Sequence, residues 1–433
     1  MRKSRRRRIL IPLLILSAGA VFVWLILRLT GSGFTMKPQL PVDTVLTVGQ
    51  VQGDRDEMIR LLEGIHPFFI LEEDRAAYDA AKNRYLEETQ EQMTIGGLQE
   101  RTARFLTVMK DGHTGIRWSE TRYLDTQWYY TDRLYLAEGD GVLTDRAVSS
   151  IGGVPVAEVF AQIDTFFPAE NTTASAYNYT YRARGEQLLA AAGVVLEQGV
   201  VSIALEDGTN IEARFMEPSD SSQEEHNTWE KRGDVFIVDY NFCEVNDELK
   251  AIAVELEKAV ADGVRNVIID ARGNQGGNSQ AGDMLLEAMG MKTGRWGIVT
   301  RFSSETSKQR GYPLPFGSWT NQPSTKESHA NSDVRLAVLT DWYTFSSATM
   351  LATDVRDGKL GILIGQPSRN NPSSYGDIIQ FQLPNSRLYG VVSHKRFLRP
   401  DAAAMDEDTL VPDIVLAPGG QDAMDAALEW LSR

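Results

Sequence analysis

Apolar side chains between about residues 53 and 110 recur at the three- and four-residue spacing of amphipathic helices. A charged run over 72–91 separates two such stretches and carries its own apolar stripe, which includes Tyr78 and Tyr85. The pattern predicts three helices, followed by a short loop over 110–115. The other repeating apolar positions are Met58, Leu61, Leu62, Ile65, Leu98, Phe105, Leu106 and Met109.

The pattern changes to short runs of β-branched and apolar residues between 116 and 225. These runs end at turn residues such as Gly152-Gly153 and Asp207-Gly208, as the strands of an antiparallel sheet do. We predict a small, mostly β module with one or two helices here, followed by a polar, acidic linker or surface loop over 217–232.

From residue 233 the chain alternates between strands of a buried type and helices with one apolar face. This alternation predicts a mainly parallel sheet, whose functional groups lie at the carboxyl ends of its strands. The predicted elements are strands at 235–238, 267–269 and 334–340, helices at 249–260 and 284–289, and a long Gly/Ser/Pro-rich loop at 300–332.

The first 28 residues combine a basic cluster with a long apolar run. Six cationic residues within 2–8 precede the 19 uncharged residues Ile9–Leu27. That length suffices to cross a bilayer, and the charge asymmetry places the N-terminus in the cytoplasm. We therefore predict a transmembrane anchor rather than a cleaved signal peptide. The expected location is the cell membrane of a bacterium, as a single-pass protein whose remaining chain lies outside the cytoplasm.

Composition narrows the possible partners and cofactors. The chain has 59 acidic and 44 basic residues, and seven of the basic ones lie in the first 28 positions, so the rest is strongly acidic and disfavours nucleic acid. Cys243 is the only cysteine, which excludes an internal disulfide. The sequence contains no CxxC or HExxH motif, so we expect neither a metal nor another cofactor. The oligomeric state stays open.

The candidate chemistry centres on Thr344–Ala348, between the predicted strand at 334–340 and the start of a helix. A serine in a strand-to-helix turn exposes its hydroxyl, and the adjacent backbone N–H groups favour developing negative charge. Several unrelated hydrolases place a nucleophile in this way. The alternative is that Ser346 or Ser347 only caps the helix.

A serine that carries out acyl transfer needs a general base and hydrogen-bond donors for the oxyanion. Gly276-Gly277 directly follows a predicted buried strand, where backbone N–H groups can approach a substrate oxygen. The N–H of Ser347 offers a second donor. Of the five histidines, His113 is the best candidate base because it lies on a glycine-flanked loop after a helix.

Five segments, taken in order, resemble the C-terminal-processing (tail-specific) serine protease family, in particular its tricorn-like branch. They are Lys110–Thr114, Asp270–Gly277, Thr344–Ala348, Gly365–Ser368 and Asp406–Asp413. The resemblance implies a crotonase/ClpP-like α/β catalytic domain with Ser346 as nucleophile and His113 as general base. It implies an oxyanion hole formed by Gly276 or Gly277 together with Ser347. The histidine-orienting acid falls on Asp406.

Two positions depart from the family pattern. Asp406 stands where the family has glutamate. The alternatives for the acid are Asp401, Glu407 and Asp408. Asn371 stands where members with a Ser–Lys dyad carry lysine, and asparagine cannot act as a base. His113 is preferred over the remote Lys395 because a histidine pKa needs less tuning than a lysine pKa for this role.

We therefore predict a membrane-anchored serine endopeptidase that hydrolyses polypeptide substrates without a cofactor. The alternative from a different class is a catalytically inactive peptide-binding protein on the same fold. The expected parts are the basic tail and anchor (1–28), a tether (29–52), a helical region with the base (53–118), a β-rich module resembling part of a PDZ domain (119–225) and the α/β protease domain (226–433).

Overall fold

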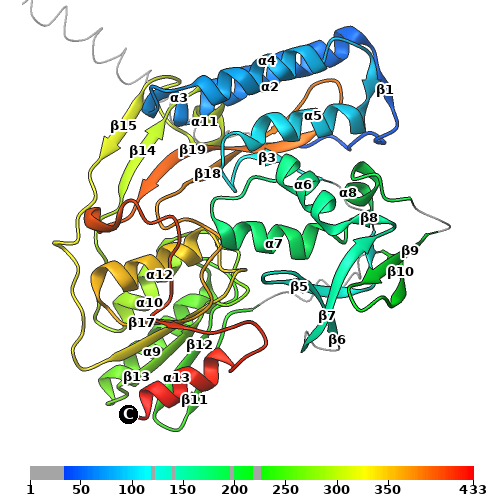
Figure 1. Ribbon diagram of the computed structural model, residues 1–433. Coiled ribbons are helices and arrows are strands. Elements are labelled where there is room, and N and C mark those ends of the chain that lie inside the picture. The colour runs from blue at the N-terminus through cyan, green and yellow to red at the C-terminus, as the bar shows by residue number, and fades with distance from the viewer. Residues whose placement is uncertain (1–33, 119–121, 139–141, 196–198, 218–225) are drawn as a thin grey trace, which may run out of the picture.

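The computed structural model describes residues 34–118, 122–138, 142–195, 199–217 and 226–433. Its three parts are a helical layer, a β-rich module and an α/β domain, which lie at the top, right and lower left of Figure 1.

One element of the predicted fold class needs correction. None of the helices in the described ranges is both long and apolar enough to cross a membrane. The longest, α2 (Val48–Ile65), has 18 residues, of which six are charged. The transmembrane helix expected within residues 1–28 lies outside the described residues. Within the described residues, the fold is a mixed α/β fold with a β-rich module.

The α/β domain is built on a six-stranded sheet of order β11-β12-β13-β16-β17-β20. All neighbouring pairs are parallel except β11 with β12. The central strands are almost continuously buried, as expected for parallel strands covered on both faces. The strands are β11 (Thr228–Arg232), β12 (Val235–Asp239), β13 (Asn266–Asp270), β16 (Arg335–Thr340), β17 (Ile362–Gly365) and β20 (Ile414–Val415).

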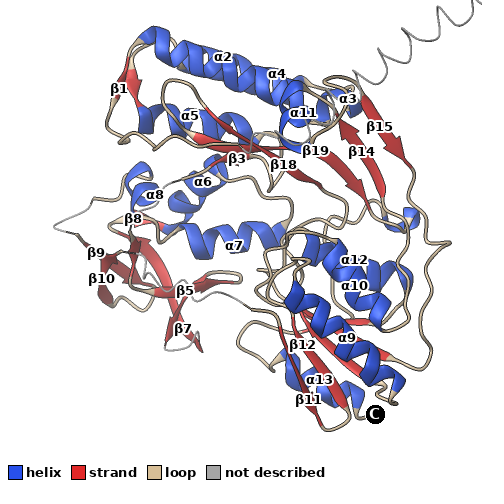
Figure 2. Cartoon of the chain, turned by 180° about the vertical axis from the view of Figure 1, so that it is seen from behind, coloured by secondary structure: helices blue, strands red, loops and turns tan. Residues whose placement is uncertain are grey.

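Helices cover both faces of this sheet (Figure 2). Side chains alternate along β13, so Val267 and Ile269 pack into one apolar core while Ile268 packs into the other. The first core contains α9 (Asp247–Ala261), α10 (Gln280–Ala288) and α12 (Ser347–Gly358), and the second contains α13 (Ala423–Leu431).

A five-stranded sheet connects the α/β domain to the helical layer. Its order is β15-β14-β19-β18, with β3 paired to β19. The segment predicted as a loop over 300–332 contains α11 and β15, which the polar pattern of that segment did not reveal. The elements are β3 (Gly115–Ile116), β14 (Gly297–Arg301), α11 (Ser304–Arg310), β15 (Ser318–Asn321), β18 (Tyr375–Gln382), β19 (Tyr389–Leu398) and the 3₁₀ helix η1 (Ala402–Ala404).

The helical layer shares a single apolar core with β18 and β19 rather than folding on its own. Ile379 and Val392 of those strands pack with Met58, Leu62 and Phe105 of the helices. This packing fixes the loop after α5, which carries His113, to the C-terminal half of the chain. The remaining elements of the layer are β1 (Val45–Leu46), α3 (Phe68–Leu71), α4 (Ala76–Glu88), β2 (Met93–Thr94) and α5 (Ile95–Thr107).

The β-rich module has a seven-stranded antiparallel sheet with three helices packed on it. Helix α7 begins at a clear signal, because the Asn171 side chain accepts a hydrogen bond from the N–H of Ala174. The strands are β4 (Tyr123–Leu124), β5 (Gln127–Tyr130), β6 (Leu134–Glu138), β7 (Val142–Ile151), β8 (Val154–Pro155), β9 (Val200–Leu205) and β10 (Asn210–Met216). The helices are α6 (Val156–Phe166), α7 (Thr172–Arg182) and α8 (Glu186–Ala191).

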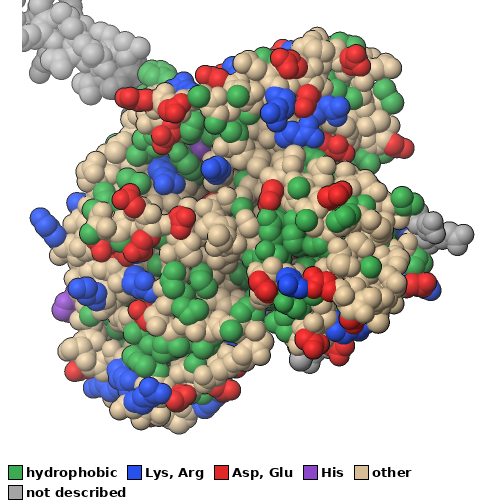
Figure 3. Space-filling view, viewed as in Figure 1, with side chains coloured by type: hydrophobic (Ala, Val, Ile, Leu, Met, Phe, Trp, Pro, Cys, Tyr) green, Lys and Arg blue, Asp and Glu red, His purple; other side chains and the backbone are tan. Residues whose placement is uncertain are grey.

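Figure 3 shows one face of the molecule with its side chains coloured by type. Acidic and basic side chains are both present over this face.

Candidate active site

Ser346 lies in the turn between β16 and α12 and is the N-cap residue of that helix. Its φ of 53° and ψ of −123° form a conformation that a residue with a side chain rarely adopts. Its N–H donates to Oδ1 of Asn370 over 2.9 Å. A strained residue between a strand and a helix N-terminus is the arrangement of a nucleophile elbow.

The serine turn is fixed to the neighbouring turn that follows β13. The Asp341 carboxylate accepts the N–H of Thr344, whose hydroxyl donates to the carbonyl of Ala271 over 3.0 Å. The N–H of Phe345 donates to the carbonyl of Asn274 over 3.0 Å. These bonds hold the two strand-end turns in one position relative to each other.

The two glycines predicted for the oxyanion hole lie beside Ser346, and the structure distinguishes them. The N–H of Gly276 donates to Oδ1 of Asn274 over 2.8 Å and is therefore already used. The carbonyl of Gly277 accepts the hydroxyl of Ser347 over 2.8 Å. Among the described residues, the backbone N–H groups of Gly277 and Ser347 have no hydrogen-bond partner, so these two are available to a substrate oxygen.

Gly276 also permits a close approach of the two turns. Its φ is 95°, and a Cβ atom at this position would lie 2.7 Å from Cβ of Ser346 and 2.9 Å from N of Ser347. Only glycine fits this position without moving the serine turn.

His113 contacts Phe345, the residue that precedes Ser346. The His113 ring stacks on Phe345 with a centroid separation of 4.4 Å and an interplanar angle of 26°. Its side chain is 10% exposed, and within the described part of the chain neither ring nitrogen has a hydrogen-bond partner. The candidate base and nucleophile are therefore neighbours, with the hydrogen bond between them unformed in this conformation.

Asp111 holds the loop that carries His113. Its Oδ1 accepts the N–H of His113 over 2.8 Å, and its Oδ2 accepts the Thr114 hydroxyl over 2.6 Å. Nε2 of His66 lies 3.2 Å from the same Oδ2. Because Nδ1 of His66 accepts the N–H of Phe68, Nε2 is the nitrogen that carries the proton and donates to Asp111.

Burial and the local side-chain interactions act in opposite directions on this pair. Burial lowers the pKa of His66, so this imidazole stays neutral. Burial also acts to raise the pKa of Asp111, but its interactions with the His113 and His66 side chains outweigh burial and hold that pKa well below its usual range. Asp111 is therefore an ionised carboxylate whose hydrogen bonds stabilise the loop that carries His113.

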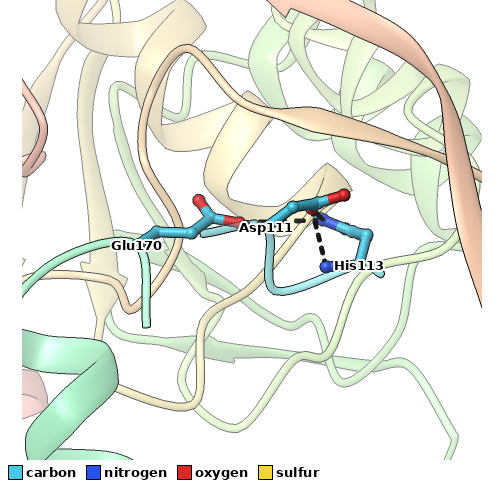
Figure 4. A group of neighbouring side chains, drawn as sticks. All are labelled: Asp111, His113 and Glu170. Atoms are coloured by element: carbon cyan, nitrogen blue, oxygen red, sulfur yellow. Dashed lines mark hydrogen bonds and ion pairs between the residues drawn. The ribbon is translucent and has the colours of Figure 1, made fainter. Parts of the chain in front are cut away.

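Two carboxylates flank the His113 ring (Figure 4). Oδ1 of Asp111 lies 3.7 Å from Nδ1 of His113, and Oε1 of Glu170 lies 4.0 Å from the same nitrogen. Glu170 comes from the loop between α6 and α7 of the β-rich module. Burial raises its pKa, against the opposing attraction of His113.

The structure does not bring Asp406, the acid expected from the sequence, to His113. Asp406 is exposed, and the described carboxylates within 4.0 Å of the His113 ring are those of Asp111 and Glu170. The alternatives are engaged elsewhere: Asp401 caps η1, Glu407 pairs with Arg399, and Asp408 accepts the Thr409 hydroxyl. Lys395, the remote alternative base, pairs with Asp377.

Sequence reasoning missed two residues of this site, Glu170 and Asn370. The Asn171 cap signal predicts a helix start and places Glu170 in the preceding loop. Nothing in the spacing of the sequence connects that loop to His113. Asn370 adjoins Asn371, which we considered only as the counterpart of a family lysine.

The group formed by Asp111, His113 and Glu170 also has the residue types of a metal site. Their ligand atoms lie within 4.8 Å of one another. However, each carboxylate already accepts three hydrogen bonds from protein donors. The donor set therefore fits a histidine flanked by acids better than a metal centre.

Residues 234–416 match peptidase family S41. The matched segment is less than half of the chain and contains both the Ser346 turn and the Gly276-Gly277 turn described above. The prediction of a C-terminal-processing serine protease family is confirmed, and the protein is a serine-type peptidase. The comparison with curated proteins gives no match for this chain.

Solved structures resemble this chain over most of its length. Mature CPAF has a TM-score of 0.58 at 14% identity, covering 88% of this chain and 96% of that one. Mature CPAF complexed with lactacystin has a TM-score of 0.58 at 13% identity, covering 88% and 97%. The photosystem II D1 C-terminal processing protease has a TM-score of 0.45 at 14% identity, covering 85% and 93%. At these identities, the CPAF likeness establishes the fold alone.

Proposed function

We propose that this protein is a serine endopeptidase that cleaves polypeptides with Ser346 as nucleophile and His113 as general base. The observation that carries the proposal is the stacking of His113 on Phe345 at 4.4 Å. It makes the candidate base a neighbour of a strained serine at a helix N-terminus.

The proposed reaction uses groups whose positions are given above. The Ser346 hydroxyl attacks the peptide carbonyl while Nε2 of His113 accepts its proton, which requires that the hydrogen bond between these two side chains forms. The N–H groups of Gly277 and Ser347 stabilise the oxyanion. His113 then protonates the leaving amine, and water hydrolyses the acyl-enzyme by the same route.

Paired variants of the full-length protein test this proposal by hydrolysis of a quenched peptide library. Ser346→Ala should remove measurable turnover, whereas Ser347→Ala keeps the backbone N–H and should retain activity within about tenfold. His113→Ala should lower kcat by at least about 100-fold, with the exposed His226→Ala as its matched control. Turnover by Ser346→Ala, or equal loss in both histidine variants, would refute the proposal. Peptide binding without cleavage by the wild-type protein would favour the inactive alternative.

A further inference from the structure

Glu170 belongs to the β-rich module, yet its carboxylate lies in the candidate active site, whose base and nucleophile come from the helical layer and the α/β domain. The side chain is 4% exposed. Its Oε1 accepts the N–H of Gly112, next to His113, over 2.9 Å. Its Oε2 accepts Nδ2 of Asn370 over 2.7 Å and the N–H of Asn371 over 2.8 Å. A single buried carboxylate therefore joins the base loop to the loop that holds Ser346.

We propose that Glu170 is a positioning residue of this protease: its carboxylate orients His113 and, through Asn370, holds the backbone of Ser346. This inference rests on the proposed function. It also gives the β-rich module a role, because the module supplies the side chain that aligns a base and a nucleophile carried by two other loops.

The path from Glu170 to the nucleophile is short and specific. Nδ2 of Asn370 donates to Glu170, which fixes the orientation of the Asn370 side-chain amide. In this orientation, Oδ1 of Asn370 accepts the N–H of Ser346 over 2.9 Å. Neither Asp111 nor Asp406 has this connection. Asp111 is bonded within its own loop and to His66, and Asp406 is exposed.

The charge of Glu170 also suits the catalytic step. His113 becomes an imidazolium when it accepts the serine proton, and a carboxylate 4.0 Å from Nδ1 stabilises that cation. Among the described residues, Asp111 also places a carboxylate against the ring, at 3.7 Å from Nδ1. Beyond the stacked Phe345, the Arg369 guanidinium lies 4.4 Å from the phenyl centroid and opposes the two acids.

The test compares Glu170→Gln with Glu170→Asp in the full-length protein, using peptide hydrolysis across pH. Glu170→Gln should lower kcat about 10- to 100-fold with KM within about threefold of wild type, since alignment rather than binding is lost. In the plot of kcat/KM against pH, the rise on the acid side should lie about one pH unit lower for Glu170→Gln than for wild type, because a negative charge beside His113 has been removed. Glu170→Asp retains the charge, so it should lose kcat but keep the wild-type acid limb.

Controls separate this inference from the proposed function. Glu158→Gln alters an exposed carboxylate of the same module and should behave as wild type, as should Asp406→Asn. The inference is overturned if Glu170→Gln keeps wild-type kcat and pH profile while Ser346→Ala is inactive, or if Asp406→Asn reproduces its losses. An active Ser346→Ala refutes the proposed function itself. If Glu170→Gln does not fold, a wild-type kcat in Glu170→Asp overturns the inference.

Discussion

Replacing Gly276 by alanine should disable the site while leaving the protein folded. The added Cβ would lie 2.7 Å from Cβ of Ser346 and 2.8 Å from the Phe345 carbonyl oxygen. Carbon atoms in good contact are about 3.5–4.0 Å apart, so the overlap is about 1 Å. The obstructing atoms are backbone and Cβ atoms that cannot rotate away, so the serine turn must shift.

Gly273 provides a matched control in the same turn. Its φ is 78°, close to the 95° of Gly276, but no atom lies within 4 Å of a Cβ built there. A left-handed conformation costs a non-glycine residue about 1–2 kcal/mol, so Gly273→Ala should lose about that much stability and Gly276→Ala should lose more because of the overlap. Only Gly276→Ala should also displace the nucleophile and the oxyanion donors.

The assay is peptide hydrolysis combined with thermal unfolding of both variants. Gly276→Ala should lower kcat/KM about 100- to 1,000-fold, comparable with the loss of an oxyanion donor. Gly273→Ala should stay within about threefold of wild type in kcat/KM, with a smaller fall in Tm than Gly276→Ala. Equal activity of the two variants would refute the placement of Gly276 against the reacting serine.

Two further predictions concern stability. Burial lowers the pKa of His394 to about 4, although Asp377 opposes this. Between about pH 6.5 and 4 the unfolded chain therefore binds the proton more readily than the folded chain. As the pH falls through this range, this group should lower the free energy of unfolding by up to about 1.4 kcal/mol per pH unit. In urea unfolding at several pH values, the free energy of unfolding of His394→Gln should depend less on pH, and an unchanged dependence would contradict this prediction. Arg399 binds Asp357 through Nε at 3.1 Å, and both side chains are 1% exposed. Arg399→Met should lower the free energy of unfolding, measured in urea, by about 3–5 kcal/mol, because it leaves the buried charge of Asp357 unpaired. The double variant Arg399→Met/Asp357→Leu should recover part of this loss. A double variant as unstable as the single one would contradict this account of the pair.

Local patterns account for the parts of the fold that could be predicted from the sequence. The apolar runs that form β12, β13 and β16 are buried on both faces, so burial dictated their composition directly. The elements within 300–332 could not be predicted in the same way. β15 is an edge strand with three exposed residues out of four, and it has no apolar alternation.

The candidate site shows the same division. The serine turn and the paired glycines each have a local signature, because strand-to-helix turns and positive φ constrain residue type. The acid has none. Glu170 reaches His113 through the packing of one module against another, and Asp406 was inferred only from the position of a family motif. In this chain Glu407, next to Asp406, pairs with Arg399 instead.

The central claim is that Ser346 is the reactive hydroxyl, and mapping a covalent adduct tests it most directly. Wild-type protein should be treated with a fluorophosphonate, digested and analysed by tandem mass spectrometry. We predict a single phosphonylated site at Ser346, with labelling slowed by at least about tenfold in His113→Ala. An adduct on Ser347 or another serine, or equally fast labelling without His113, would contradict the account.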